Sequence, residues 1–433
     1  MKIAWASPIA KRSAIGRFSV EVVDALIARG NQVDFIRTEV EQEQAGDVHP
    51  CLASITPWRK VTPDWLASHD IVIVNVGDNF LFHAGVFPLL KAAPCVGVFH
   101  DFYLHNLFLG WLADGGGDVR AHEDALVTTY GEGARAAAPR LRSGAVPLEQ
   151  IASDYPMTEW IGAQCAGAMT HSKFYAQRLL DSCPGPVATQ HLAWRSRREF
   201  PHPQPKAEAE KLVVLTIGVV NSNKCVDRMT TAIAGDPALS ARINYRVAGP
   251  VADAERARLE ELAQTMGFEG LTLLGGVDDA QLEDEIIGAD VISCLRRPVL
   301  EGGSASAIEG ILSKRPVIVA DAGFYAELPD AFVVKVGADI EIDDLRAALH
   351  RLVDDFQLRL QMGVAGAEWG AEAFSAQTYA RAIEALAAET VSVAPIAAVA
   401  ARYGRAFHDL GLAPSDPNVR RIADRLGALF AFG

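Results

Sequence analysis

Short apolar runs alternate with amphipathic segments in two successive blocks of this 433-residue chain, and this alternation restricts the fold more than any other feature. In the first block, runs rich in β-branched residues predict strands at 2–6, 32–36, 71–76, 95–99 and 168–171, with helices at 17–29 and 172–180. In the second block, the same pattern predicts strands at 212–217, 243–248, 271–274, 291–295, 316–320 and 332–336, with helices at 252–266 and 279–287. Continuous apolar strands joined by helices are typical of parallel sheets covered on both faces. The chain is therefore predicted to be an α/β protein with two doubly wound parallel sheets.

The two blocks predict a division into domains. Residues 1–193 form the first domain and residues 212–388 the second; residues 194–211 between them are polar, contain three prolines and read as a linker. Residues 389–433 are predicted to add two short helices as a C-terminal extension. The Gly- and Ala-rich segment 108–150 is either a lid or a helical excursion of the first domain. Ligands of doubly wound sheets bind beyond the carboxyl ends of the strands, so we expect the site in a cleft between the domains.

Bulk composition excludes some functions. The net charge of −14 argues against nucleic acid as a partner, because such proteins present a basic surface. Six scattered cysteines without a C-x-x-C pair indicate a reducing compartment and no metal site. The start of the chain has no signal-peptide pattern, and no run approaches the ~18 apolar residues of a membrane span. We therefore expect a cytoplasmic protein, and peripheral contact with the inner face of a membrane stays open, as does the oligomeric state.

The segment that follows the strand at 291–295 carries two glutamates with bare backbone between them. Glu301 follows the strand on a loop, and Glu309 lies more than one turn into a helix that begins near Ser304. Gly302, Gly303 and Ser304 present backbone N–H groups at the start of that helix, where anions bind readily. A loop carboxylate, free amides and a helical carboxylate could hold a polyhydroxylated ligand that bears phosphate.

The E-x7-E spacing of Glu301 and Glu309 resembles the signature of the retaining glycosyltransferases of family 4, and the similarity extends over roughly residues 1–388. The resemblance implies the GT-B architecture, with two Rossmann-like domains facing each other across a cleft. It also implies that Glu309 holds the donor ribose, that Glu301 lies against the donor sugar, and that the amides of 302–304 contact sugar and phosphate. By chance alone, two glutamates at this spacing are common in an acidic protein.

Residues 218–224 follow the first strand of the second domain and resemble the family's G-x5-K phosphate element. The resemblance makes Gly218, Asn223 and Lys224 donor-binding residues, with Lys224 neutralising the departing diphosphate. Many family members carry an arginine after the glycine, where this chain has Val219. The candidates for that second cation are Arg228, Arg296 and Arg297, of which we favour Arg296. The simpler alternative for Lys224 is a solvated loop lysine.

Five residues of the first domain are candidates on the opposite side of the cleft. His100 and Asp101 end the strand at 95–99, where the family has a histidine beside the bond to be broken. His100 is therefore a candidate for catalysis, and Asp101 and His105 for contacts with the acceptor. Gly16, in the loop before the first helix, resembles the family's glycine that approaches donor phosphate, and Arg17 next to it could touch either phosphate or acceptor. Simple packing or turn roles are the alternative for His100 and Gly16.

The resemblance implies transfer of a hexose-type sugar from a UDP- or GDP-sugar to a hydroxyl of a glycan or glycolipid acceptor. Such enzymes act most often in lipopolysaccharide or other surface polysaccharide assembly, and natural-product glycosylation uses the same chemistry. No cofactor and no metal are expected, since the cleft loops lack a D-x-D motif. Two other functions stay open: a nucleotide-sugar 2-epimerase, which needs no acceptor, and a non-catalytic sugar-binding module of the same architecture.

Overall fold

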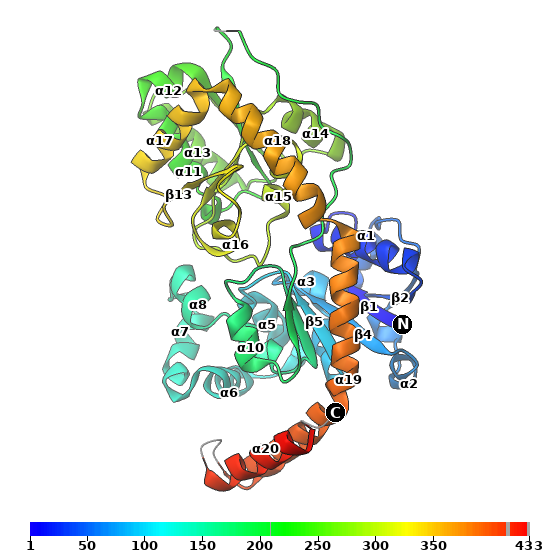
Figure 1. The fold of residues 1–433 in the computed structure, drawn as a ribbon. Helices are drawn as coiled ribbons and strands as arrows, with labels where there is room; N and C mark the ends of the chain where they lie inside the picture. Colours follow the sequence, from blue (N-terminus) through cyan, green and yellow to red (C-terminus); the bar gives the residue numbers. More distant parts are fainter. Residues whose placement is uncertain (208, 413–415, 431–433) are drawn as a thin grey trace.

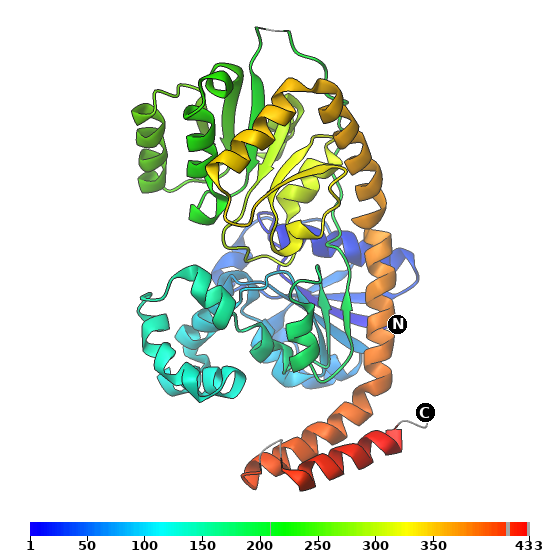
Figure 2. The ribbon, with the colours of Figure 1, turned by 60° about the vertical axis from the view of Figure 1, so that its left-hand side comes forward.

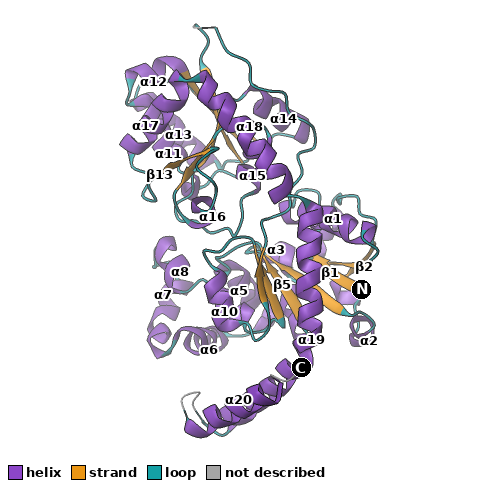
Figure 3. Cartoon of the chain, viewed as in Figure 1, coloured by secondary structure: helices purple, strands orange, loops and turns teal. Residues whose placement is uncertain are grey.

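The structure is a computed structural model that describes residues 1–207, 209–412 and 416–430. It consists of two α/β domains, each built on an entirely parallel sheet, with helices on both faces (Figures 1 and 3). The predicted fold class is therefore confirmed. The domains face each other through the carboxyl ends of their strands, which is where the candidate residues lie.

The N-terminal sheet has seven strands in the order β3-β2-β1-β4-β5-β6-β7. Its strands are β1 (Lys2–Ser7), β2 (Gln32–Arg37), β3 (Ser54–Pro57), β4 (Ile71–Val76), β5 (Cys95–Phe99), β6 (Gly167–Thr170) and β7 (Val187–Thr189). The order reverses at β1, which pairs with β2 on one side and β4 on the other. The predicted strands match, while the two edge strands β3 and β7 were missed because they are short and lack a continuous apolar run.

The helices of the N-terminal domain are α1 (Ala14–Ala28), α2 (Pro63–Ala67), α3 (Phe80–His83), α4 (Val86–Ala92), α5 (His105–Trp111), α6 (Val119–Tyr130), α7 (Ala138–Arg142), α8 (Leu148–Asp154), α9 (Thr158–Gly162) and α10 (Ala176–Ser182), with short 3-10 or π turns η1 (Glu41–Ala45), η2 (Trp58–Lys60), η3 (Leu112–Gly116) and η4 (Glu132–Ala137). The segment 108–150 is thus a helical excursion with an apolar core of its own, in which Phe108, Leu126 and Leu141 are buried.

The C-terminal sheet has six strands in the order β10-β9-β8-β11-β12-β13. Its strands are β8 (Leu212–Ile217), β9 (Ile243–Ala248), β10 (Leu271–Gly275), β11 (Val291–Cys294), β12 (Val317–Ala320) and β13 (Val333–Val336). The helices are η5 (Ser222–Lys224), α11 (Val226–Ala234), α12 (Pro237–Arg242), α13 (Asp253–Thr265), α14 (Asp279–Gly288), α15 (Ala305–Leu312), α16 (Gly323–Ala326), α17 (Ile342–Asp354) and α18 (Phe356–Ala373). The strand order reverses between β8 and β11, which pair with each other, so the loops after these two strands meet at the cleft.

The chain then returns to the N-terminal domain through one long helix. Helix α19 (Ala376–Asp409) packs along α1, β6 and β7 and ends in a hairpin with α20 (Pro417–Phe430), which projects beyond the N-terminal domain (Figure 2). Two short helices after residue 390 were predicted, but the first begins fourteen residues earlier, at Ala376. Its small and apolar residues continue without a break across the predicted boundary at 388. Residues 413–415 and 431–433 of the predicted extension lie outside the described residues.

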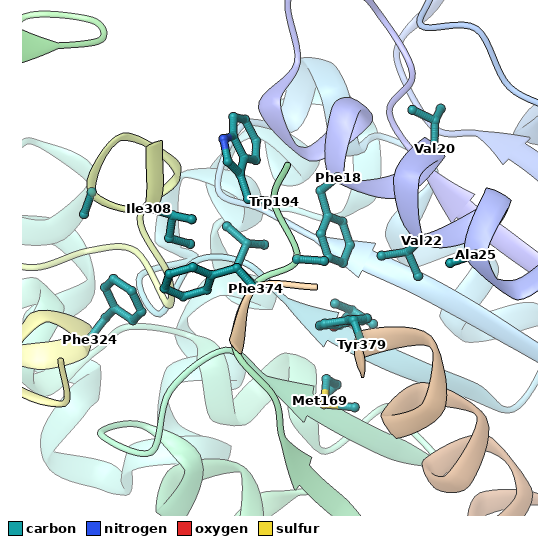
Figure 4. Packing of buried hydrophobic residues seen from close by; sticks show 14 of the residues in the cluster. Phe18, Val20, Val22, Ala25, Met169, Trp194, Ile308, Phe324, Phe374 and Tyr379 are labelled. Atoms are coloured by element: carbon teal, nitrogen blue, oxygen red, sulfur yellow. The ribbon is translucent and has the colours of Figure 1, made fainter. Parts of the chain in front are cut away.

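The predicted linker contains no helix or strand among its described residues, yet it is anchored rather than free. Trp194 and Phe200 are buried, 9% and 2% exposed, in a core that joins the two domains. Figure 4 shows Trp194 between Ile308 of the C-terminal domain and Phe18 of the N-terminal domain. Burial of two large aromatic side chains fixes the path of the linker across the interface.

One helical stretch of the described chain, Phe356–Gly404, contains an 18-residue window with a mean hydropathy of 1.6, so by length and composition alone it could cross a bilayer. Both helices of this stretch pack against the protein: α18 packs on α15, and α19 packs on α1. Core helices of proteins without membrane spans pass the same test, so this composition is weak evidence for a membrane span.

Candidate active site

The loop at residues 300–304 docks directly onto the N-terminal domain. The amide of Gly302 donates to the His100 carbonyl at 2.7 Å, and the Leu300 carbonyl accepts from the amides of Phe102 and Tyr103 at 2.9 and 3.0 Å. Backbone of the two domains therefore pairs at the centre of the cleft. The amide of Gly302 was expected to be free for a ligand, but in this conformation the His100 carbonyl occupies it.

Glycine is required in this loop because the domains approach so closely. A Cβ on Gly302 would lie 2.2 Å from the Tyr175 hydroxyl, and a Cβ on Gly303 would lie 3.2 Å from His171 and Leu192. The amide of Gly303 and that of Ser304, the N-cap of α15, lie next along the chain at the positive end of the helix dipole. The role of these two amides as anion donors stays a prediction.

Lys224 ends the short helix η5 in the segment that follows β8, and it is only 7% exposed. Its ammonium donates to the Ile217 carbonyl at 2.5 Å, and a Cβ on Gly218 would lie 2.7 Å from Nζ. Gly218 has a φ of +99°, so glycine is required both for the turn and for room beside the ammonium. Burial, and then the charge of Arg296, lower the pKa of Lys224 from 10.5 to about 7. A solvated loop lysine is thus excluded, because the side chain is buried and faces the other candidate residues.

Arg296 and Glu301 form a buried ion pair beside Lys224. The Arg296 Nε lies 2.9 Å from the Glu301 Oε1, which also accepts from the Tyr325 hydroxyl at 2.5 Å. Burial raises the pKa of Glu301, but Arg296 and Tyr325 lower it more, so the net pKa is below its usual value. Glu301 is therefore a fixed carboxylate, and its Oε2 has only a long contact of 3.4 Å with the Leu300 amide.

Of the three candidates for a second cation, only Arg296 lies beside Lys224 and Glu301. Arg228 donates to the Asp339 and Ile340 carbonyls, and Arg297 pairs with Glu149 and Asp339, at the edge of the interface. Asn223, before Lys224, is buried and its side-chain oxygen has no hydrogen-bond partner. This oxygen is an acceptor, so it can bind a ligand hydroxyl or N–H but not a phosphate oxygen.

Glu309, on α15, contacts residues from outside its domain. Its Oε2 accepts from the indole N–H of Trp194 at 2.5 Å and lies 4.0 Å from Nη1 of Arg17. Arg17 was considered for either phosphate or acceptor contacts, and the structure places it beside the predicted ribose carboxylate. Gly16, in the first turn of α1, packs against the backbone of Pro8, 3.1 Å from a Cβ placed there, so it permits close packing of this helix.

The imidazole of His100 is 5% exposed and both ring nitrogens have partners. Nε2 lies 2.9 Å from the Asn75 side-chain oxygen, and Nδ1 lies 3.2 Å from Nε2 of His171. Burial, and then His171 and His83, hold the pKa of His100 well below its usual value, so the ring is neutral near pH 7. In this conformation its carbonyl, not its ring, contacts the donor-side loop. A catalytic role for His100 stays a prediction.

The other two N-terminal candidates, His105 and Asp101, lie in different surroundings. His105 is 1% exposed, with Nδ1 2.9 Å from the Tyr155 carbonyl, so it packs under the helical excursion instead of facing the cleft. Asp101 forms an isolated bridge with Glu301 and accepts from the Asp78 amide at 2.8 Å. Burial, opposed in part by that hydrogen bond, and the charge of Glu301 raise the pKa of Asp101 to about 7.

Replacing Asp101 with asparagine is expected to stabilise the protein more at pH 8 than at pH 5. Because the pKa rises from 3.8 to about 7 on folding, the folded chain retains a proton that the unfolded chain releases, and stability falls as the pH rises through this window. Asparagine imitates the protonated acid beside Asp78 and Glu301. The expected gain in Tm at pH 8 is about 2–4 °C, roughly 1 kcal/mol. Thermal unfolding at both pH values, with exposed Asp181→Asn as control, measures it; equal Tm values at pH 8 would contradict the expectation.

A cavity of about 670 Å³ lies beside Trp194, between α1, α18 and the linker. It is lined by Glu21, Asp24, Arg195 and Lys314, among others, but by none of Lys224, Glu301 and Glu309. This cavity therefore borders the candidate site at Trp194 but does not contain its charged residues. Among the described residues, no group of three or more His, Cys, Asp or Glu side chains is arranged to hold a metal ion.

Sequence reasoning missed Trp194, Tyr325 and Asn75 as parts of this site. Asn75 and Tyr325 lie inside or after apolar runs, where their polar atoms could have been noted as needing partners. Trp194 opens the linker, and its burial depends on how the two domains pack.

The two parallel-sheet domains, with their site between them, define the GT-B fold. Residues 197–369, which include Lys224, Arg296, Glu301 and Glu309, match the family described as "Glycosyl transferases group 1". The match supports a glycosyltransferase. No curated protein matches the sequence.

Solved structures with the same fold are distant in sequence. HepE from Anabaena, in complex with UDP and glucose, has 13% identity and a TM-score of 0.59, covering 90% of this chain and 99% of that one. Sucrose-phosphate synthase from Thermosynechococcus elongatus has 16% identity and a TM-score of 0.59, covering 89% and 98%. WaaG, a glycosyltransferase involved in lipopolysaccharide biosynthesis, has 14% identity and a TM-score of 0.55, covering 87% and 98%. At these identities the likeness establishes the fold alone.

Proposed function

We propose that this protein is a retaining glycosyltransferase of family 4 that transfers a hexose-type sugar from a UDP- or GDP-sugar to a hydroxyl acceptor. The observation that carries the proposal is the buried cluster of Lys224, Arg296 and Glu301 at the carboxyl ends of β8 and β11. A buried ammonium at this position supports the proposal, because it can stabilise the charge of a departing diphosphate. The acceptor is proposed to be a glycan or glycolipid of surface polysaccharide assembly, reached in the cytoplasm or at the inner face of a membrane.

Each part of the cluster has a task in this reaction. The diphosphate lies on Lys224 and the amides of Gly303 and Ser304, which stabilise the negative charge that develops as its bond to the sugar breaks. The sugar lies against Glu301 and the ribose against Glu309. The acceptor oxygen attacks the anomeric carbon on the face from which the diphosphate leaves, and its proton passes to a diphosphate oxygen. Retention follows from that geometry, and fixed cations and amides make a metal unnecessary.

Product analysis tests this function directly. With UDP-glucose and GDP-mannose in turn, in the presence of EDTA, a transferase forms a glycoside of unchanged anomeric configuration only when an acceptor is added. UDP-glucose is the first choice because HepE was solved with UDP-glucose. Release of an altered free sugar without acceptor would identify an epimerase, and no turnover with any donor would favour a binding module.

The affinity for nucleoside diphosphate is expected to fall as the pH rises from 7 to 9. Lys224 has a pKa of about 7 without ligand, and a bound diphosphate raises it, so binding takes up a proton. The expected loss is about tenfold or more over two pH units. Titration calorimetry with UDP in two buffers of different ionisation enthalpy measures both proton uptake and affinity. A pH-independent affinity, or proton uptake that persists in Lys224→Met, would contradict the assignment.

A further inference from the structure

The Glu309 carboxylate is held by groups that do not belong to its own domain. The indole N–H of Trp194 donates to Oε2 at 2.5 Å, and the Arg17 guanidinium lies 4.0 Å from the same oxygen. Trp194 and Glu309 are 9% and 8% exposed, so both side chains are nearly removed from water. A hydrogen bond to a charged acceptor in such surroundings is stronger than one in water.

Arg17 and Trp194 also support each other. The Arg17 guanidinium stacks over the Trp194 ring at 4.2 Å, a cation–π contact that fixes both planes. Arg17 in turn pairs with Glu21 one turn along α1, at 3.3 Å, and donates to the Arg195 carbonyl of the linker. Helix α1, the linker and helix α15 therefore meet at one carboxylate (Figure 4 shows Trp194 at this junction).

The geometry leaves room for a ligand on Glu309. A carboxylate has about four acceptor positions on two oxygens, and Trp194 uses one of them. Oε1 has no protein partner among the hydrogen bonds of the described residues, and the glutamate side chain is 11% exposed. Fixing Oε2 holds the rotamer of a side chain with three rotatable bonds, so a ligand hydroxyl meets Oε1 already oriented.

We propose that Trp194 and Arg17 position Glu309 for the donor ribose, so that the linker and the first helix complete a subsite otherwise formed by the C-terminal domain. Trp194 acts through its N–H, and Arg17 acts through its stacking on the ring. This assignment rests on the proposed function, in which Glu309 binds ribose. It makes Arg17 a donor-side residue instead of an acceptor contact, and it makes ribose recognition depend on how the domains are docked.

Trp194→Phe tests the assignment, because phenylalanine keeps a ring under Arg17 but has no N–H. The probes are UDP and its 2′,3′-dideoxy analogue, with the GDP pair measured in parallel. The unaltered protein is expected to bind UDP more tightly than the analogue. In Trp194→Phe, UDP binding is expected to weaken about tenfold while the analogue is unaffected, so the discrimination collapses. KM for the donor sugar rises with little change in kcat.

Trp58→Phe is the matched control. Trp58 also donates its indole N–H to a carbonyl, that of Glu39 at 3.3 Å, and also carries a stacked arginine, Arg59 at 4.4 Å, but it lies within the N-terminal domain. Its substitution is expected to leave the UDP-to-analogue ratio unchanged. An unchanged ratio in folded Trp194→Phe would overturn the positioning role.

The outcomes separate this inference from the proposed function. If the unaltered protein binds UDP and GDP no better than their dideoxy analogues, Glu309 does not hold ribose and the proposed role of Glu309 fails first. If Trp194→Phe does not fold, Arg17→Gln replaces it, with an expected loss of about threefold in the same ratio because the ring loses its stacked cation. A normal ratio in Arg17→Gln would then overturn the inference.

Discussion

Replacing Lys224 with methionine is expected to lower kcat/KM for the sugar donor by about 10²–10³-fold. Methionine fills a similar volume but carries no charge, so the leaving diphosphate loses the buried cation that faces it. The fold should persist, because Lys224 is 7% exposed and burial lowers its pKa to about 7, so the buried charge costs stability instead of adding it. Initial rates at varied donor concentration, together with thermal unfolding, measure both effects.

Lys335→Met is the control for this substitution. Lys335 also lies in the C-terminal domain and donates to a backbone carbonyl, that of Ala326 at 2.8 Å, but it is at the surface beside Asp330. Its removal should leave the rate unchanged. Turnover by Lys224→Met at the rate of the Lys335→Met variant would show that Lys224 does not contact the diphosphate.

Replacing Glu301 with glutamine is expected to lower both stability and activity. The substitution leaves the Arg296 guanidinium buried without its carboxylate, 2.9 Å away in the intact pair, and breaking a buried pair in this way costs about 3–5 kcal/mol. Transfer should fall about 10²-fold or more, because the carboxylate lies against the reacting sugar in the proposed complex. Urea unfolding and initial rates are the two measurements.

A double variant separates the two effects. In Arg296→Met with Glu301→Gln, the guanidinium no longer lies buried without its carboxylate, so most of the lost stability should return. Activity should stay low, since both charged groups beside Lys224 are gone. Recovery of stability together with full activity would mean that the ion pair only supports the fold. Failure of stability to return would mean that Glu301 acts mainly through Tyr325.

The strands were predictable because each central strand is a continuous apolar run between polar turns. Ile71–Val76 and Cys95–Phe99 begin and end where the sequence pattern places them. Edge strands β3 and β7 contact only one neighbour and need fewer apolar residues, so their signal is weak. The course of α19 could not be predicted, because its return to the N-terminal domain depends on tertiary packing.

The candidate site shows the same division between local pattern and long-range packing. Lys224, Glu301 and the preference for Arg296 follow from position at strand ends, and the structure brings these three together. The orientation of His100 does not follow from position, because Asn75 of β4 and His171, which follows β6, hold its ring in the interior. Trp194 lies 115 residues from Glu309, and no local pattern indicates that pairing.

A crystal structure with bound UDP tests the central claim most directly. The account predicts that the diphosphate lies within hydrogen-bonding distance of Lys224 Nζ and the Ser304 amide, with the ribose hydroxyls at Glu309. Density for UDP elsewhere, for instance in the cavity of about 670 Å³ beside Glu21 and Lys314, would contradict it.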